Sequence, residues 1–77
     1  MKRTSELILV NDPQVNGMAV IMALIRAGLS GDLAGHVVDE VERYGKAPAM
    51  VTSSTRCRRI CHKMLRLGIP ALVRPLA

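Results

Sequence analysis

Apolar and polar positions along the chain predict a strand and then two helices in its first half. Glu6–Val10 is short, apolar and rich in β-branched residues, which is typical of a strand. In Asn11-Asp12-Pro13, aspartate at the cap and proline at the first helical position favour a helix start, so the first helix is expected from Pro13 or Gly17 to Ala27. Because apolar residues occupy nearly every side of it, this helix is predicted to be central and buried. Its expected core residues are Met18, Ile21, Met22, Leu24 and Ile25.

The second predicted helix follows the turn Leu29-Ser30-Gly31-Asp32 and ends at Gly45. Its apolar positions keep helical spacing while acidic side chains take the outer face. The predicted apolar positions are Leu33, Val37, Val38, Val41 and Tyr44. His36 stands beside this stripe without a partner at metal-ligand spacing, so it is interpreted as a partly exposed structural residue.

The third predicted helix, within Ser53–Gly68, has the strongest pattern in the chain. At about 100° per residue, its apolar and basic side chains fall on opposite sides, with no acid among them. Small hydroxyl residues at its start can cap the first free N–H groups, and Gly68 provides a left-handed stop. The apolar side holds Cys57, Ile60, Cys61, Met64, Leu65 and Leu67; the other side holds Arg56, Arg58, Arg59, His62, Lys63 and Arg66.

Two segments complete the pattern. Lys46–Thr52 contains Pro48, which excludes a helix interior, and is either a connecting loop or a strand of about four residues. Ile69–Pro75 is predicted to be a short strand, and its two prolines favour the edge of a sheet. The sequence therefore predicts a single α+β domain over residues 1–77.

Composition limits the size and the location of this domain. Its 77 residues include one Tyr and no Phe or Trp, so the core consists of small aliphatic side chains. Either marginal stability or self-association, for example as a homodimer, is therefore expected. The apolar runs are too short for a secretory signal or a membrane span, which predicts a cytoplasmic protein with no membrane partner. Cys57 and Cys61 lie four residues apart on one helix, a poor geometry for a disulfide, and are interpreted as core residues.

Charge is distributed unevenly along the chain. Residues 1–45 hold four basic and six acidic residues, a net charge of −2, whereas residues 46–77 hold seven basic residues and no acid, a net charge of +7. Such a half attracts polyanions by long-range steering. The third helix is thus predicted to face an anionic partner.

The sequence offers no catalytic or metal-binding set, and we predict that the protein is not an enzyme and carries no cofactor. Most acids lie on the outer face of the second helix, with no apolar pocket to raise a pKa. His62 has no orienting acid nearby in the sequence, and a nucleophilic triad is not expected. Cys57, Cys61 and His62 lack a fourth ligand, and His62 points about 100° away from Cys61. No glycine-rich phosphate loop is present.

The chain resembles winged-helix DNA-binding regulators of the PadR type between Met18 and Val73. The resemblance rests on Val20–Ile25, Leu29-Ser30-Gly31, Ser53-Ser54-Thr55 and the segment from Arg58 to Ile69. It implies a compact three-helix winged-helix-like domain whose third helix enters the major groove of duplex DNA. By position, Ser53, Ser54, Thr55, Arg56 and Arg59 would approach bases or phosphates, and Arg58, His62, Lys63 and Arg66 the nucleic-acid backbone.

A second resemblance is to the small α/β domain of the Clp protease adaptor and the ribosomal stalk protein. The start of the adaptor is similar to Leu9-Val10-Asn11-Asp12 with Met18. The first helix of the stalk domain is similar to Ala19-Val20-Ile21 with Ala23. It implies a βααβαβ sandwich if Ala49–Thr52 is a strand. The adaptor's peptide-pocket histidine has no clear match after the second helix, where Glu40-Val41-Glu42 stands. Here the basic helix would face an acidic protein partner.

The sequence by itself favours the first resemblance, because the uneven charge and the capped basic helix agree with it. The resulting hypothesis is a small transcription regulator that binds duplex DNA, or RNA, through its third helix. The alternative is a non-enzymatic adaptor or inhibitor that binds an acidic protein.

Overall fold

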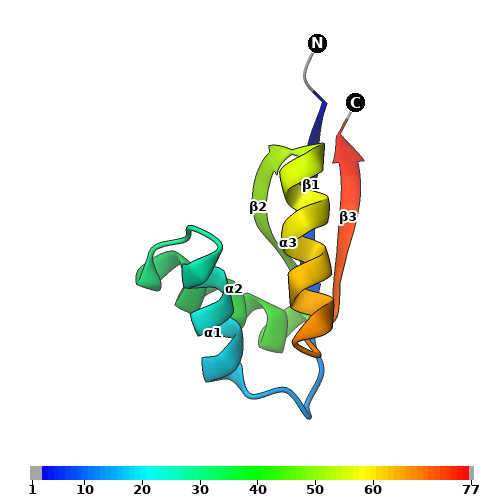
Figure 1. Cartoon of the computed structure of the whole chain (residues 1–77). Coiled ribbons are helices and arrows are strands. Elements are labelled where there is room, and N and C mark those ends of the chain that lie inside the picture. The colour runs from blue at the N-terminus through cyan, green and yellow to red at the C-terminus, as the bar shows by residue number, and fades with distance from the viewer. Residues whose placement is uncertain (1–2, 77) are drawn as a thin grey trace.

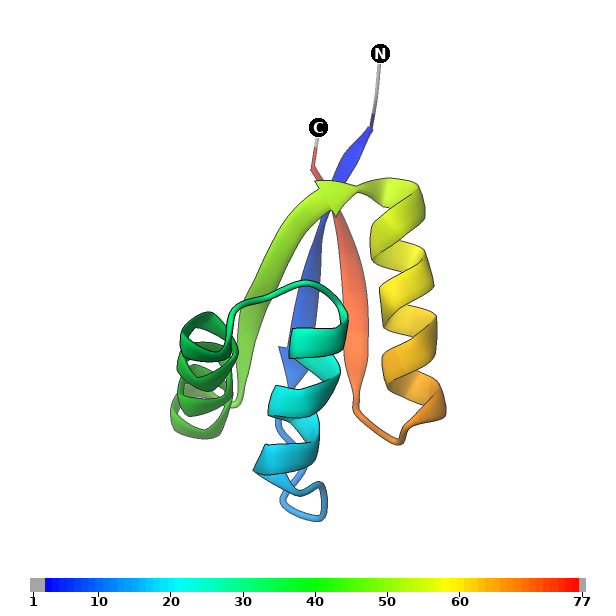
Figure 2. The same cartoon turned by 60° about the vertical axis from the view of Figure 1, so that its left-hand side comes forward.

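The computed structural model describes residues 3–76, which form three helices over one antiparallel sheet (Figure 1). The elements are β1 (Thr4–Val10), α1 (Gly17–Arg26), α2 (Gly31–Tyr44), β2 (Lys46–Ser53), α3 (Ser54–Arg66) and β3 (Ala71–Leu76). The strand order is β2-β1-β3, and all three helices lie on the same side of the sheet (Figure 2). The predicted α+β class is confirmed, in the βααβαβ order of the alternative. No helix within residues 3–76 is long and apolar enough to cross a membrane.

Strand β1 is the centre of the sheet, and its alternating side chains define the two sheet faces. Ser5, Leu7 and Leu9 point toward the helices and are buried, while the residues between them are only half-buried. The buried Ser5 hydroxyl forms a 2.6 Å hydrogen bond with the Ser54 hydroxyl at the start of α3. Apolar alternation and this polar contact together set which face of β1 meets the helices.

The undecided segment before α3 is strand β2, which pairs with β1 along its whole length. Pro48 of β2 pairs with Ile8 of β1. The register of the two strands shifts by one residue there, between Leu7 and Ile8 of β1. Proline is tolerated there because β2 is an edge strand and needs to bond on one side only. Strand β3 is the other edge, as its prolines predicted.

The winged-helix architecture is wrong for two reasons. An eight-residue strand separates α2 from α3, so the two helices are not joined by a turn. In addition, β2 and β3 both pair with β1 and not with each other, so they form no wing hairpin. Long-range pairing with β1 decides the architecture, and a helix-by-helix reading of the sequence does not contain that information.

Helix α1 departs most from the sequence-based expectation. Asn16, not Asp12, is its cap, and the Asn16 side chain accepts a hydrogen bond from the Met18 amide. Only Ala23 and Leu24 are buried, whereas Met18 and Met22 are 63% and 48% exposed. The prediction of a buried central helix is therefore wrong. An apolar surface on every side does not indicate which side faces the core.

Helices α2 and α3 pack with the faces that their periodicity predicts. The buried residues are Ala34, Val37, Val38 and Val41 on α2, and Cys57, Ile60, Cys61 and Met64 on α3. Four residues expected in these apolar faces are exposed instead, namely Leu33, Tyr44, Leu65 and Leu67. The two cysteines are free thiols, in agreement with the prediction that they do not bridge.

Candidate functional site

A pocket of about 400 Å³ lies where β1 ends and the chain turns toward α1. The loop after β1, the start of α1, the second half of α2 and the turn before β3 surround it. Most of the side chains that line it are apolar, and the polar ones come from the loop and from α2. The lining residues are Leu9, Val10, Asn11, Asp12, Pro13, Val15, Gly17, Val20, Val38, Val41, Glu42, Ile69 and Pro70.

Backbone hydrogen bonds fix the loop that carries Asp12. The Val10 amide donates to the Pro70 carbonyl at 3.0 Å, and the Asn11 amide donates to the Gly45 carbonyl at 2.8 Å. The Asp12 carboxylate then accepts from the Gln14 amide at 2.9 Å, which is a local turn of the Asx type. Asp12 is half-buried, and among the described residues only its Oδ1 takes part in a hydrogen bond.

Glu42 reaches the same pocket from the last turn of α2. A Cβ atom added at Gly17 would lie 3.2 Å from Glu42 Oε1 and 3.5 Å from Val38 Cγ1. The Glu42 carboxylate therefore lies close to the first residue of α1, where free N–H groups and the helix dipole stabilise negative charge. The absence of a side chain at Gly17 leaves this part of the pocket open.

The charge of the pocket selects the kind of ligand that it suits. Two carboxylates line it and no cationic side chain does. Within residues 3–76, no group of three or more His, Cys, Asp or Glu side chains is arranged to hold a metal ion. An organic ammonium group beside an apolar substituent matches both the acids and the apolar wall.

The residues predicted to bind nucleic acid lie along α3, and several of them have structural roles. The Ser53 hydroxyl caps α3 by accepting from the Arg56 amide at 3.2 Å, and Ser54 bonds to Ser5. The Arg56 guanidinium donates to the Ala27 carbonyl at 3.0 Å and so joins α3 to the end of α1. These three side chains stabilise the fold, whereas Thr55 is exposed.

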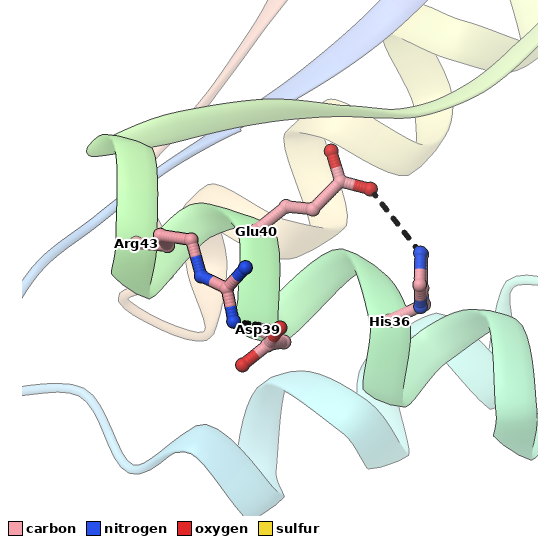
Figure 3. A network of polar contacts seen from close by, with 4 residues as sticks. All are labelled: His36, Asp39, Glu40 and Arg43. Carbon is pink, nitrogen blue, oxygen red and sulfur yellow. Dashed lines mark hydrogen bonds and ion pairs between the residues drawn. The ribbon is translucent and has the colours of Figure 1, made fainter.

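The rest of the predicted set forms one exposed surface, here called the basic face. It comprises Arg58, Arg59, His62, Lys63 and Arg66. None of the five takes part in an ion pair within the described residues. Helix α2 differs, because Arg43 pairs with Asp39 at 3.3 Å and the exposed His36 lies 3.7 Å from Glu40 (Figure 3). Charge on α2 is thus compensated locally, and charge on α3 is not.

The two cysteines lie on the buried face of α3 and are not placed for nucleophilic chemistry. The Cys57 thiol contacts the Ser5 carbonyl oxygen at 3.2 Å inside the core. Burial, and then the neighbouring Cys57, raise the pKa of the Cys61 thiol above its ordinary value of 9.0. The Cys61 thiol is therefore protonated at neutral pH.

The fold is similar to a solved structure with a bound ligand. The structure of ClpS2 from Agrobacterium tumefaciens bound to L-phenylalaninamide superposes with a TM-score of 0.89 at 18% sequence identity, covering 99% of this chain and 100% of that chain. No protein-family model and no curated protein sequence matches the chain. The likeness establishes a ClpS-type fold.

The interpretation as a winged-helix, helix-turn-helix DNA-binding transcription regulator is corrected by these observations. The matching structure is a ClpS protein rather than a DNA-binding regulator. In addition, α3 lies along the sheet as one layer of a two-layer sandwich and does not follow α2 through a tight turn. The unevenly distributed charge is real, but it does not by itself distinguish nucleic acid from an acidic protein.

Sequence reasoning did not place Asp12 and Glu42 in one pocket. Asp12 was interpreted as a helix cap and Glu42 as part of a solvated helix face. Thirty residues separate them, so no local motif links the two carboxylates. The available signal was the resemblance of Leu9-Val10-Asn11-Asp12 to the start of the Clp adaptor, which pointed to the correct fold.

Proposed function

We propose that this protein is a non-enzymatic adaptor that holds the amino-terminal residue of a partner polypeptide in the pocket between β1, α1 and α2. The observation that carries the proposal is the pairing of two carboxylates, on Asp12 and Glu42, with a largely apolar wall. L-Phenylalaninamide, the ligand of the similar ClpS2 structure, has a free amino group and an apolar side chain. The same two features characterise the first residue of a polypeptide.

Each part of the pocket has a role in this proposal. The free Asp12 carboxylate oxygen and the Glu42 carboxylate accept hydrogen bonds from the ammonium group, and their charge distinguishes a free amine from an internal amide. Val38, Val41 and Ile69 contact the first side chain and shield it from water. The open space at Gly17 accommodates part of that side chain. The protein binds and presents its ligand, and no bond is made or broken.

The test compares two peptides that differ only at the amino group. A peptide beginning with Phe and labelled with a fluorophore at its carboxyl end is titrated by fluorescence anisotropy, both free and N-acetylated. The free form is expected to bind at least about tenfold tighter, since each charged hydrogen bond contributes roughly 1.5–3 kcal/mol. Asp12→Asn and Glu42→Gln, which keep the side-chain shape, should each remove most of this difference. Gly17→Ala should weaken binding by filling the pocket.

The matched control is Glu40→Gln, which removes an α2 carboxylate that pairs with His36 outside the pocket. It should leave peptide affinity unchanged. Equal binding of the free and acetylated peptides, or equal losses for Glu40→Gln and Glu42→Gln, would show that the pocket does not recognise an amino terminus.

The basic face of α3 supports a second part of the proposal, which is that the adaptor also contacts an acidic protein. Its side chains are exposed, share one sign and have no acidic partner within the described residues. Binding of an N-acetylated polyglutamate peptide should weaken steeply with salt and be lost in the variant Arg58→Glu/Arg59→Glu. If binding persists in this variant at low salt, the basic face is not the contact surface.

A further inference from the structure

A second hollow, of about 460 Å³, lies between α1 and α3 and shares no lining residue with the pocket. It is here called the α1–α3 groove. Its apolar part comes from Ala23, Ala27, Ile60, Met64 and Leu67, and its cationic part from Arg26, Lys63 and Arg66. No acid lines it. Figure 2 shows the two helices side by side in front of the sheet and separated along their length.

Small side chains on α1 create the groove. Ala23 and Ala27 lie four residues apart, on the side of α1 that faces α3, and neither reaches across to it. Arg56 joins the two helices through its hydrogen bond to the Ala27 carbonyl. A Cβ atom at Gly28, whose φ is +115°, would lie 3.0 Å from Arg56 Nη2, so glycine leaves room for this guanidinium. The separation of α1 and α3 is therefore fixed by a specific contact.

The apolar part of the groove is covered by this chain at Ala23, Ile60 and Met64 but not at Leu67. Leu67 is 63% exposed at the end of α3, beside the half-buried Ala27. Covering such a surface with an aliphatic side chain is favourable, and a ligand that also carries carboxylates would complement the surrounding cations. An ordinary acidic surface would satisfy Arg26, Lys63 and Arg66 but would leave the apolar part in water.

We propose that the α1–α3 groove binds an acidic peptide segment that carries one large aliphatic side chain between its carboxylates. The aliphatic side chain lies over Ala23, Ala27 and Leu67. The flanking carboxylates pair with Lys63 and Arg66 on α3 and with Arg26 on α1. This site extends the proposed acidic contact of the basic face and rests on it, and it adds a requirement for an apolar residue at one position.

The test uses two N-acetylated, C-amidated peptides, so that neither can enter the pocket through a free amine. They have the sequences Glu-Glu-Leu-Glu-Glu and Glu-Glu-Ser-Glu-Glu, and each carries a fluorophore on a linker. The leucine peptide is expected to bind roughly ten- to a hundredfold tighter, the range that corresponds to burying one leucine side chain. Leu67→Ser should remove most of that advantage without changing the affinity for the serine peptide.

Two matched controls separate the groove from general effects on α3. Leu65→Ser removes an equally exposed leucine of the same helix that does not line the groove, and it should leave both affinities unchanged. Two double variants remove the same amount of charge, one inside the groove and one outside it. They are Lys63→Gln/Arg66→Gln and Arg58→Gln/Arg59→Gln, in that order. Only the first pair should reduce the leucine advantage. Circular dichroism establishes that all four variants are folded.

The outcomes distinguish this proposal from the one on which it rests. Equal affinities for the leucine and serine peptides would overturn the groove and leave the basic face as an acidic contact. Equal losses for Leu65→Ser and Leu67→Ser would also overturn it. If neither peptide binds at low salt, both the groove and the acidic contact are wrong, whereas the pocket is tested separately by peptides with a free amino terminus.

Discussion

Individual side chains have different roles on the two proposed binding surfaces. In the pocket, the half-buried Asp12 and the exposed Glu42 supply negative charge beside apolar side chains. On α3, the exposed guanidinium groups lie in water and act mainly through long-range attraction. Arg56 belongs to neither surface, since its hydrogen bond to Ala27 makes it a structural residue.

The buried thiol of Cys61 gives a prediction about pH. Because burial raises its pKa in the folded protein above 9.0, the unfolded chain loses this proton first as the pH rises. The contribution to stability is complete below about pH 9 and is lost as the pH increases above that value, by at most about 1.4 kcal/mol per pH unit. Urea unfolding in reducing buffer between pH 7.5 and 10 should show this loss.

Cys61→Ala provides the comparison for the thiol. The other ionisable groups are common to both proteins. The gap in unfolding free energy between the wild type and Cys61→Ala should therefore narrow above pH 9. A gap that stays constant would mean that the thiol ionises equally in the folded and unfolded states.

At the scale of elements, α1 is a surface helix in spite of its composition. It is attached to the core mainly through Ala23 and Leu24, and its methionines face outward. Helix α3, in contrast, buries a full apolar face and is capped by Ser53. An amphipathic pattern thus predicts burial correctly, while a uniformly apolar pattern does not.

Paired substitutions in α1 test this difference. Leu24→Ala removes a fully buried side chain and should lower the free energy of unfolding by about 2–5 kcal/mol. Met22→Ala changes a half-exposed side chain and should cost less than about 1 kcal/mol. Chemical denaturation measures both. Comparable losses would place Met22 in the core and contradict the exposed position of this helix face.

For the whole molecule, the arrangement of the two hollows matters most. The pocket lies beside the start of α1 and the groove beside its end, with no residue in common. An adaptor needs this property, because it must hold two ligands at once. The lopsided charge of the chain also follows this division, with the acids of the pocket in its first half and the cations of α3 in its second.

Simultaneous binding is the corresponding prediction. The affinity for a peptide with a free amino-terminal Phe should change by less than about twofold when the acetylated leucine peptide is saturating, since sites without shared partners act independently. Anisotropy titrations with one labelled and one unlabelled peptide measure this. Displacement of the first peptide by the second would show that the surfaces overlap or are antagonistic.

Much of the fold was predictable from particular residues. The strand at Glu6–Val10, the capped and amphipathic α3, and the edge position of the last strand follow from local pattern and from proline placement. Lys46–Thr52 stayed undecided because Pro48 is compatible with a loop and with an edge strand, and only pairing with β1 distinguishes the two. For the same reason the winged-helix architecture was chosen wrongly.

The sequence by itself determined which side of α2 and α3 is apolar and where the cations of α3 gather, because these properties repeat within one helix. Tertiary structure alone decided that β1 lies between β2 and β3, that α1 exposes its methionines, and that Asp12 meets Glu42 across one pocket. The physical reason is distance along the chain. Contacts between residues thirty or more positions apart depend on how complete elements pack, and no local periodicity encodes that packing.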